Sequence, residues 1–282
     1  MRSILHFTLL GWAFLFANVD GLTQETVQPN SFVICYNPSV PPEDFAPYPM
    51  VVVDYAYPPT AVAELRRRGK IVFGYLSIAK VHLQRPFASD VQSLGIQHDR
   101  DPQFPGSVRV NAADPKWREL VVQMVVPKIK RLGFNGIFLD DLDDLKNRKL
   151  EQHGVSLIRE IRQANPEIKL MANRGLEYLA GFAPHVDFVL LESCFVLSGQ
   201  LRKPADSAWA MDLLNVGKGI NPKLQGVAID YIQKPKPQST ANKKQSLPQS
   251  QLRLVAKIRE LHAKHDLLSC VSTEDLQSVP GF

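Results

Sequence analysis

The amino-acid sequence predicts an α/β fold of one domain, a (β/α)8 barrel of the TIM type, over residues 31–282. Three observations support this prediction. Apolar runs of strand length recur eight times, segments of helical periodicity separate many of them, and the length suits such a barrel, which typically has about 250 residues. Strands that alternate with helices are expected to pair in parallel. The predicted strands cover residues 31–36, 50–54, 70–76, 136–140, 168–172, 187–192, 224–229 and 267–271.

The segments between the strands carry helix signals. Helices are predicted over residues 59–68, 114–132, 152–164, 207–216 and 251–265. Asp114 and Pro115 are typical of an N-cap and a first helical position, and Pro127 should kink the same helix. An open doubly wound sheet is the alternative. Against it, the first strand runs into Asn37-Pro38 without the glycine-rich phosphate loop of that fold.

Two long polar segments lie outside this pattern. Residues 81–110 follow the third strand and are rich in Asp, Gln and Pro, and residues 233–250 follow the seventh strand and are low in complexity. Because both follow strand ends, both are expected to border a cleft at the face of the barrel that carries the chemistry.

Residues 1–21 have the pattern of a secretory signal peptide. Arg2 precedes an apolar stretch from Ile4 to Ala17, and cleavage is expected after Gly21. The stretch is short for a membrane span, although an uncleaved anchor is the alternative. The sequence has no usable Asn-x-Ser/Thr site, because Asn37 precedes a proline. We therefore expect bacterial export, a secreted or periplasmic location, and no stable membrane insertion after removal of the peptide.

Charge and cysteine content narrow the classes of partner. The net charge is +5, but the basic residues are scattered and form no basic helix interleaved with aromatics, so no nucleic-acid partner is expected. Cys35, Cys194 and Cys270 are too few for a disulfide scaffold. A bridge between Cys35 and Cys270, on the first and last strands, and three buried thiols are the two alternatives.

Polar residues gather where the predicted strands end, which is where α/β folds keep their chemistry. Asp140 and Glu192 each directly end an apolar run, and two such carboxylates could supply the acid pair that hydrolysis of a glycosidic bond requires. A rim of acids, amides, hydroxyls and tyrosines suits a polyhydroxylated ligand. The candidate substrate-binding residues are Tyr36, Asp54, Tyr55, Tyr57, Ser77, Asp141, Asn173, Arg174, Asp230 and Tyr231.

Each of these residues also has a structural interpretation. Asp54 could hydrogen-bond a loop backbone, Asn173 could shape a turn, and the tyrosines could be packing residues. A calcium loop beginning at Asp140 fails on spacing, because Leu142 takes the third position and Leu145 the sixth, where an oxygen ligand and glycine are needed. The strand ends offer no histidine, so we expect neither a metal nor a cofactor.

Several of these motifs, in this order, resemble a known family. Val53-Asp54-Tyr55-Ala56-Tyr57, Gly74-Tyr75-Leu76-Ser77-Ile78, the run from Gly133 to Asp140, Asn173-Arg174-Gly175 and Leu191-Glu192-Ser193 are similar to the endo-α-1,4-polygalactosaminidases, glycoside hydrolase family 114. A related domain is the hydrolase portion of a Pel exopolysaccharide biosynthesis protein. The resemblance covers about residues 31–272.

The resemblance implies a (β/α)8 barrel, export, and cleavage of an amino-sugar polysaccharide with Asp140 and Glu192 as the carboxylate pair, in a protein expected to be a monomer. One position departs from it, because Ala79-Lys80 follows the third strand where the family usually has Gly-Glu. Lys80 could repel cationic sugars from the cleft rim, or point into solvent. A second hypothesis is therefore an inactive homologue that binds polysaccharide without cutting it.

Overall fold

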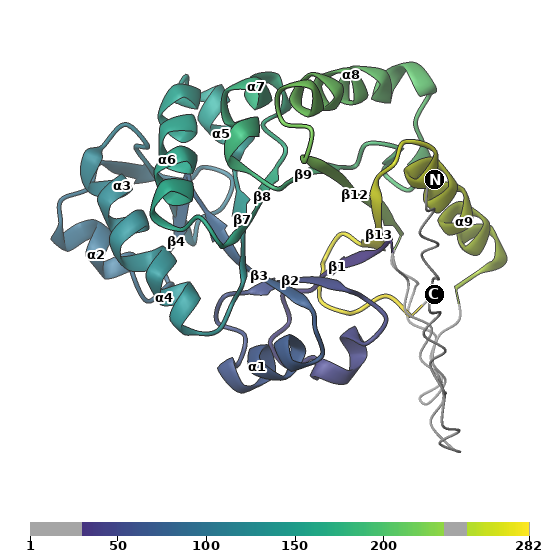
Figure 1. The fold of residues 1–282 in the computed structure, drawn as a ribbon, viewed down its shortest axis with the longest axis horizontal. Coiled ribbons are helices and arrows are strands. Elements are labelled where there is room, and N and C mark those ends of the chain that lie inside the picture. Colours follow the sequence, from purple (N-terminus) through teal and green to yellow (C-terminus); the bar gives the residue numbers. More distant parts are fainter. Residues whose placement is uncertain (1–29, 234–246, 282) are drawn as a thin grey trace, which may run out of the picture.

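The fold is a nearly closed ring of eight parallel strands surrounded by helices, which confirms the predicted architecture (Figure 1). The computed structural model describes residues 30–233 and 247–281, so the predicted signal peptide and most of the segment 233–250 lie outside the described residues. The ring consists, in both chain and spatial order, of β1 (Phe32–Ile34), β2 (Met50–Asp54), β3 (Ile71–Ser77), β7 (Gly136–Asp140), β8 (Lys169–Asn173), β9 (Phe188–Glu192), β12 (Gln225–Ile232) and β13 (Leu268–Thr273).

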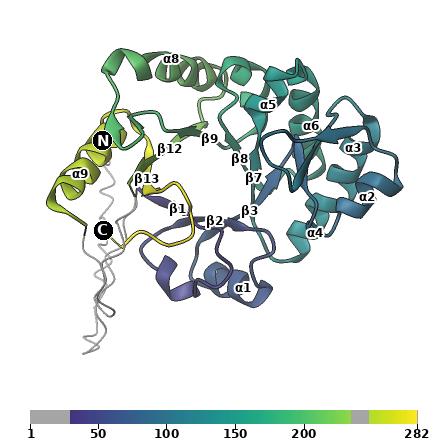
Figure 2. The same cartoon turned by 180° about the vertical axis from the view of Figure 1, so that it is seen from behind.

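The first and last strands meet and bring the ring close to closure. Ser31 and Ser269 form an isolated parallel bridge beside β1 and β13, and the Ser269 N–H donates to the carbonyl of Asn30 at 2.9 Å. Figure 2 shows the same ring from its other end. All eight strands predicted from the sequence are present, with ends that differ by up to three residues.

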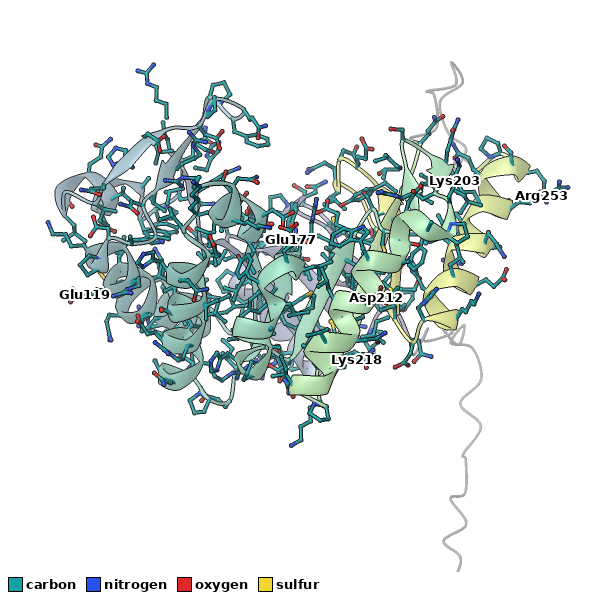
Figure 3. All side chains as sticks on the ribbon, turned by 90° about the horizontal axis from the view of Figure 1, so that it is seen from above. Glu119, Glu177, Lys203, Asp212, Lys218 and Arg253 are labelled. Carbon is teal, nitrogen blue, oxygen red and sulfur yellow. The ribbon has the colours of Figure 1, made fainter. Side chains whose placement is uncertain are left out.

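Helices cover the outside of the ring. The α-helices are α1 (Pro59–Arg67), α2 (Ala88–Ser93), α3 (Pro115–Leu120), α4 (Val126–Arg131), α5 (Leu142–Asn147), α6 (Glu151–Ala164), α7 (Leu179–Phe182), α8 (Pro204–Ile220) and α9 (Gln249–Lys264). Short 3-10 turns, η1 (Pro42–Phe45), η3 (Leu176–Tyr178) and η4 (Ala183–His185), join some of them. Charged side chains such as Glu119, Lys218 and Arg253 lie on these outer helices (Figure 3).

The helix predicted over residues 114–132 is present and interrupted near its proline. Asp114 caps α3 by accepting a hydrogen bond from the Lys116 N–H at 2.9 Å, and Pro115 occupies the first turn. A π-helical turn, η2 (Val121–Val125), then leads into α4 just before Pro127. Because Pro127 has no backbone N–H, the regular hydrogen-bond ladder cannot continue through it, which explains the break.

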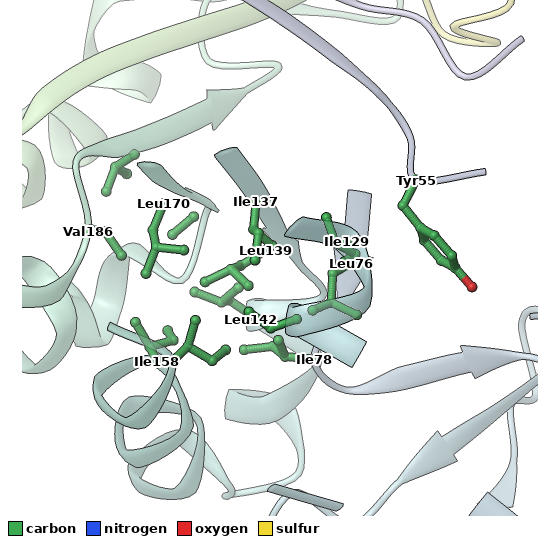
Figure 4. Packing of buried hydrophobic residues seen from close by; sticks show 14 of the residues in the cluster. Tyr55, Leu76, Ile78, Ile129, Ile137, Leu139, Leu142, Ile158, Leu170 and Val186 are labelled. Atoms are coloured by element: carbon green, nitrogen blue, oxygen red, sulfur yellow. The ribbon is translucent and has the colours of Figure 1, made fainter. Parts of the chain in front are cut away.

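Side chains along each strand alternate between the barrel interior and the helices. The interior cluster consists of Phe32, Ile34, Met50, Val52, Phe73, Phe138, Met171, Leu190, Val227, Ile229, Tyr231, Cys270 and Leu276. The intervening residues pack outward. Figure 4 shows Ile137, Leu139 and Leu170 of this outer layer near Ile158 of α6. This alternation decides which strand-end side chains reach the barrel mouth.

Two additions follow strand ends. The predicted excursion 81–110 contains a small antiparallel sheet with the order β4 (Lys80–His82), β6 (Ser107–Val110), β5 (His98–Arg100), together with α2. A second hairpin, β10 (Val196–Leu197) and β11 (Gln200–Leu201), follows β9. Neither sheet was predicted, because these strands are short and several of their residues are polar.

All three cysteines are free and buried, so the alternative of three buried thiols is correct and the bridge between Cys35 and Cys270 is not present. Cys35 packs in the outer layer and Cys270 in the barrel interior, so their side chains lie on opposite faces of the sheet. None of the described helices is both long enough and apolar enough to cross a membrane.

Candidate active site

Three neighbouring strands end in polar residues that point into the barrel mouth. Asp140 ends β7, Asn173 ends β8 and Glu192 ends β9. Each stands two residues beyond a member of the interior cluster, so each continues the inward-facing alternation of its strand. The three side chains therefore meet above the packed interior, as the positions of Asp140 and Glu192 in the sequence predict.

The amide of Asn173 joins the two carboxylates. Its Nδ2 donates to Asp140 Oδ1 at 2.8 Å and to Glu192 Oε2 at 3.2 Å. Because one nitrogen contacts both oxygens, the oxygens lie at most about 6 Å apart. The predicted substrate contact Asn173 is thus also the residue that fixes the spacing of the acid pair.

A tyrosine hydroxyl holds the second oxygen of each carboxylate. Tyr75 Oη donates to Asp140 Oδ2 at 2.8 Å, and Tyr231 Oη donates to Glu192 Oε1 at 2.7 Å. Burial, followed by the charge of the adjacent carboxylate, raises the pKa of both tyrosines well above the ordinary range, so both remain donors at neutral pH. Within the described chain, no Lys or Arg forms an ion pair with either carboxylate.

The residue after each of these strand ends has a left-handed backbone. Asp141, Arg174 and Ser193 have φ of 65°, 62° and 52°. For residues other than glycine this conformation costs about 1–2 kcal/mol. Specific bonds hold it here: Ser77 Oγ donates to Asp141 Oδ2 at 2.6 Å, and the N–H groups of Arg174 and Ser193 donate to carbonyls of the next strand at 3.0 and 2.9 Å.

Lys80 lies in the wall of the cleft and not in solvent. Its Nζ is 3.2 Å from Asp141 Oδ1 and 3.3 Å from Asp101 Oδ2, and its side chain is 13% exposed. Burial lowers the pKa of Lys80, but the neighbouring carboxylates outweigh it and raise the pKa overall. The pKa of Asp141 is raised by burial and by the charge of Asp140, with Ser77 and Lys80 opposing the rise. Lys80 therefore neutralises two acids and leaves Asp140 and Glu192 in place.

Two adjoining hollows open at this end of the barrel. The first, of about 360 Å³, contains both carboxylates and is lined by Tyr36, Lys80, Asp140, Asp141, Asp143, Asp144, Asn173, Arg174, Glu192 and Tyr231, among others. The second, of about 640 Å³, shares Tyr36, Lys80, Asp140 and Asp141 with the first and adds Asp54, Tyr55, Tyr75, Ser77, Arg85, Phe87 and Phe104. Eight of the ten predicted substrate-binding residues border one hollow or both.

Asp54 makes the loop hydrogen bond considered for it and also borders the second hollow. Its Oδ1 accepts a hydrogen bond from the Ala56 N–H at 2.8 Å, as expected of a turn-forming acid, and also one from Arg85 Nη1 at 2.6 Å inside the second hollow. Arg174 is half-exposed, lines the first hollow and forms an ion pair with Asp143 at 2.7 Å.

Two predicted substrate contacts, Asp230 and Tyr57, are corrected by the structure. Asp230 is fully buried and points out of the barrel, where its Oδ1 accepts the N–H groups of Phe195 and Val196 and its Oδ2 lies 2.8 Å from His262 Nε2. Tyr57 is also buried, and its hydroxyl donates to the Val40 carbonyl at 2.6 Å. Both residues stabilise the loops around the site and lie outside both hollows.

The residues that sequence reasoning missed come from β3 and from the excursion after it. Tyr75 falls two residues before Ser77, so the alternation along β3 could have indicated its inward position. Arg85, Gln103 and Phe104 belong to loops whose course the sequence does not reveal. In the described residues no cluster of three or more His, Cys, Asp or Glu side chains is arranged to hold a metal ion.

A (β/α)8 barrel with a pair of carboxylates at the carboxyl ends of its strands has the architecture of a glycosidase. The family comparison agrees: residues 17–272 match the model of glycoside-hydrolase family GH114, and the chain belongs to this family. The protein is therefore a glycosidase.

Two solved structures share the fold. The glycoside hydrolase domain of PelA from Pseudomonas aeruginosa is 23% identical with a TM-score of 0.71, and the match covers 88% of this chain and 96% of that one. Ega3 from Aspergillus fumigatus, in complex with galactosamine, is 15% identical with a TM-score of 0.63, covering 87% and 91%.

One curated protein matches part of the sequence. A lipoyl synthase from Photobacterium profundum is 36% identical over 123 residues, which are 40% of this chain and 36% of that protein. The match spans about a third of that protein's length.

Proposed function

We propose that the protein is a secreted hydrolase that cleaves a polysaccharide containing amino sugars, with Asp140 and Glu192 as its carboxylate pair. The observation that carries this proposal is the pair itself: two carboxylates joined by one amide nitrogen, at 2.8 and 3.2 Å, in a hollow at the carboxyl ends of the strands. The similarity to PelA and to the galactosamine complex of Ega3 supports the choice of substrate class.

The spacing of the pair favours a retaining mechanism. Retaining glycosidases have carboxyl groups about 5–5.5 Å apart, whereas inverting enzymes leave about 6.5–9.5 Å for a water molecule. The nearest oxygens of Asp140 and Glu192 are at most about 6 Å apart, which leaves little room for a water between them. A displacement through a covalent intermediate therefore fits this site best.

The hydrogen bonds favour Asp140 as the nucleophile and Glu192 as the acid and base. Asp140 has the shorter side chain and accepts two bonds of 2.8 Å on its two oxygens, whereas Glu192 has a longer side chain and accepts bonds of 2.7 Å from Tyr231 and 3.2 Å from Asn173. Glu192 protonates the glycosidic oxygen as Asp140 attacks the anomeric carbon and the glycosidic bond breaks. Glu192 then takes a proton from water, which attacks the same carbon and releases Asp140.

The charge of the first hollow suits an amine. Its lining carries five carboxylates, Asp140, Asp141, Asp143, Asp144 and Glu192, against two cations, Lys80 and Arg174, which gives a formal net charge of −3. Such a concave acidic surface attracts and retains a protonated amino group. Lys80 forms ion pairs within the wall, so the departure at this position does not remove the acidic character of the hollow.

The test is hydrolysis of de-N-acetylated α-1,4-linked galactosamine polymer by purified protein, with products identified by mass spectrometry. Asp140→Asn and Glu192→Gln should each lower turnover by at least about 10²-fold. Asp212→Asn, on the outer helix α8 (Figure 3), is the control and should behave as wild type. Wild-type turnover in either site variant would refute the pair, and binding without any cleavage would favour the inactive polysaccharide-binding homologue.

A further inference from the structure

We propose that the second hollow is a subsite for a neutral, N-acetylated sugar unit next to the cleaved free-amine unit. This inference rests on the proposed function. It adds a preference for the acetylation state of neighbouring sugar units, so that the enzyme would cut partly acetylated amino-sugar polymers at selected positions. The acetylated unit would lie on the non-reducing side of the cleaved unit. The second hollow borders Asp140 but not Glu192, the proposed acid, so it lies away from the leaving group.

The second hollow differs from the first in charge. Its lining carries three carboxylates, Asp54, Asp140 and Asp141, against Lys80 and Arg85, which gives a formal net charge of −1 compared with −3 in the first hollow. Of these acids, Asp54 is the one that the first hollow lacks, and Arg85 Nη1 lies 2.6 Å from its Oδ1. Because Asp54 is already paired with a cation, it offers a protonated amine less attraction than an unpaired acid.

Arg85 also occupies the aromatic faces that could otherwise attract an ammonium group. Its guanidinium carbon is 4.8 Å from the ring centre of Tyr55 and 5.6 Å from that of Tyr75. Because cation–π attraction at these rings is already used by a permanent cation, a second cation would be repelled. A neutral acetamido group has no such penalty.

The lining of the second hollow suits the methyl group of an acetamide. Five aromatic side chains border it, namely Tyr36, Tyr55, Tyr75, Phe87 and Phe104. Its volume of about 640 Å³ exceeds the 360 Å³ of the first hollow, so it has room for the larger, acylated unit. Lys80 Nζ lies 5.0 Å from the centre of the Phe104 ring, and Phe104 is 57% exposed, which leaves part of its surface for packing on a sugar ring.

The loop that carries Phe104 is held in place by Asp101, a residue of the same excursion. Asp101 Oδ1 accepts the N–H groups of Gln103 and Phe104 at 2.9 and 3.3 Å, and Lys80 links Asp101 to Asp141 at the end of β7. Lys80 thus connects the aromatic rim of the second hollow to the strand that carries Asp140.

Tyr55 offers a buried hydroxyl beside the Arg85 guanidinium. The residue is 3% exposed, and among the described residues its hydroxyl makes no hydrogen bond of regular geometry, although the charge of Arg85 lies close to it. Figure 4 shows the ring apart from the aliphatic cluster, with its hydroxyl directed away from it. Burial raises the pKa of Tyr55 to about 12, so the hydroxyl stays protonated. A hydroxyl of this kind can donate to the carbonyl oxygen of an acetamido group.

The experiment compares fully deacetylated, partly acetylated and fully acetylated α-1,4-linked galactosamine polymers, and sequences the products by tandem mass spectrometry. Wild type should release oligosaccharides that end in a free-amine unit preceded by an acetylated unit. Tyr55→Phe should lower the preference for the partly acetylated over the deacetylated polymer, measured as a ratio of kcat/KM, by about fivefold to tenfold. Tyr57→Phe is the matched control, since that hydroxyl is bonded to Val40 outside the hollow, and should leave the ratio unchanged.

Two results would overturn the subsite while the proposed function stands. One is cleavage of the deacetylated polymer with no enrichment of acetylated units at the penultimate position. The other is a Tyr55→Phe variant with the wild-type ratio and product pattern. Failure to cut any of the three polymers would refute both the subsite and the proposed function.

Discussion

Replacing Asn173 by alanine should cripple catalysis while leaving the fold intact. Asn173 Nδ2 contacts Asp140 Oδ1 at 2.8 Å and Glu192 Oε2 at 3.2 Å. A hydrogen bond to a charged group contributes about 1.5–3 kcal/mol.

Counting both bonds at the low end gives a loss of about 3 kcal/mol, which corresponds to about 10²-fold in rate. Because the amide positions the pair, the loss should appear in kcat more than in KM. Steady-state kinetics on a verified amino-sugar polymer measures it, and urea denaturation checks that the variant is folded.

Asn147→Ala is the matched control, because Asn147 lines the same hollow without a hydrogen bond to either carboxylate among those described. If Asn173→Ala retained wild-type kcat, the amide bridge would have no role in holding the pair, and the mechanism built on its spacing would fail.

Three further predictions follow from other parts of the chain. The exported protein should begin near Leu22 when its N-terminus is read by mass spectrometry, and a chain that still begins at Met1 would revive the membrane anchor. Lys80→Met should lower the free energy of unfolding by about 3 kcal/mol, because it leaves Asp101 and Asp141 without their cation. Urea titrations would measure this against the exposed-site control Lys128→Met. Equal stability of the two variants would mean that the ion pairs of Lys80 contribute nothing. Asp230→Asn should destabilise the protein by a similar amount in thermal denaturation, since it breaks a buried contact with His262. The same variant should leave KM unchanged. A raised KM in the folded variant would restore Asp230 as a substrate contact.

The barrel was predictable because its strands are buried on both faces and read as continuous apolar runs. The small sheet formed by β4, β5 and β6 was not, because β5 consists of three exposed polar residues, His98, Asp99 and Arg100. Its strands pair with one another through backbone hydrogen bonds. No local pattern in the sequence encodes such contacts, so Arg85 and Phe104 could not be placed in the site.

The error at Asp230 has a physical origin in the alternation of side chains along a strand. Residues of a strand alternate between the interior and the helices, and Asp140, Asn173 and Glu192 share the inward phase. Asp230 has the outward phase, because its neighbours Ile229 and Tyr231 are the ones that face the interior. Apolar runs locate a strand but not its phase, so a polar residue at a strand end can belong to either face.

The left-handed residues after β7, β8 and β9 separate the chemistry of the barrel from its loops. Asp141, Arg174 and Ser193 each turn the chain immediately beyond a strand-end side chain, and each is held by a hydrogen bond to the neighbouring strand. Beyond these three points a loop can be lengthened, shortened or exchanged without moving Asp140, Asn173 or Glu192. Loop exchange at these junctions would therefore change which polymer the enzyme recognises while the proposed catalytic carboxylates keep their places.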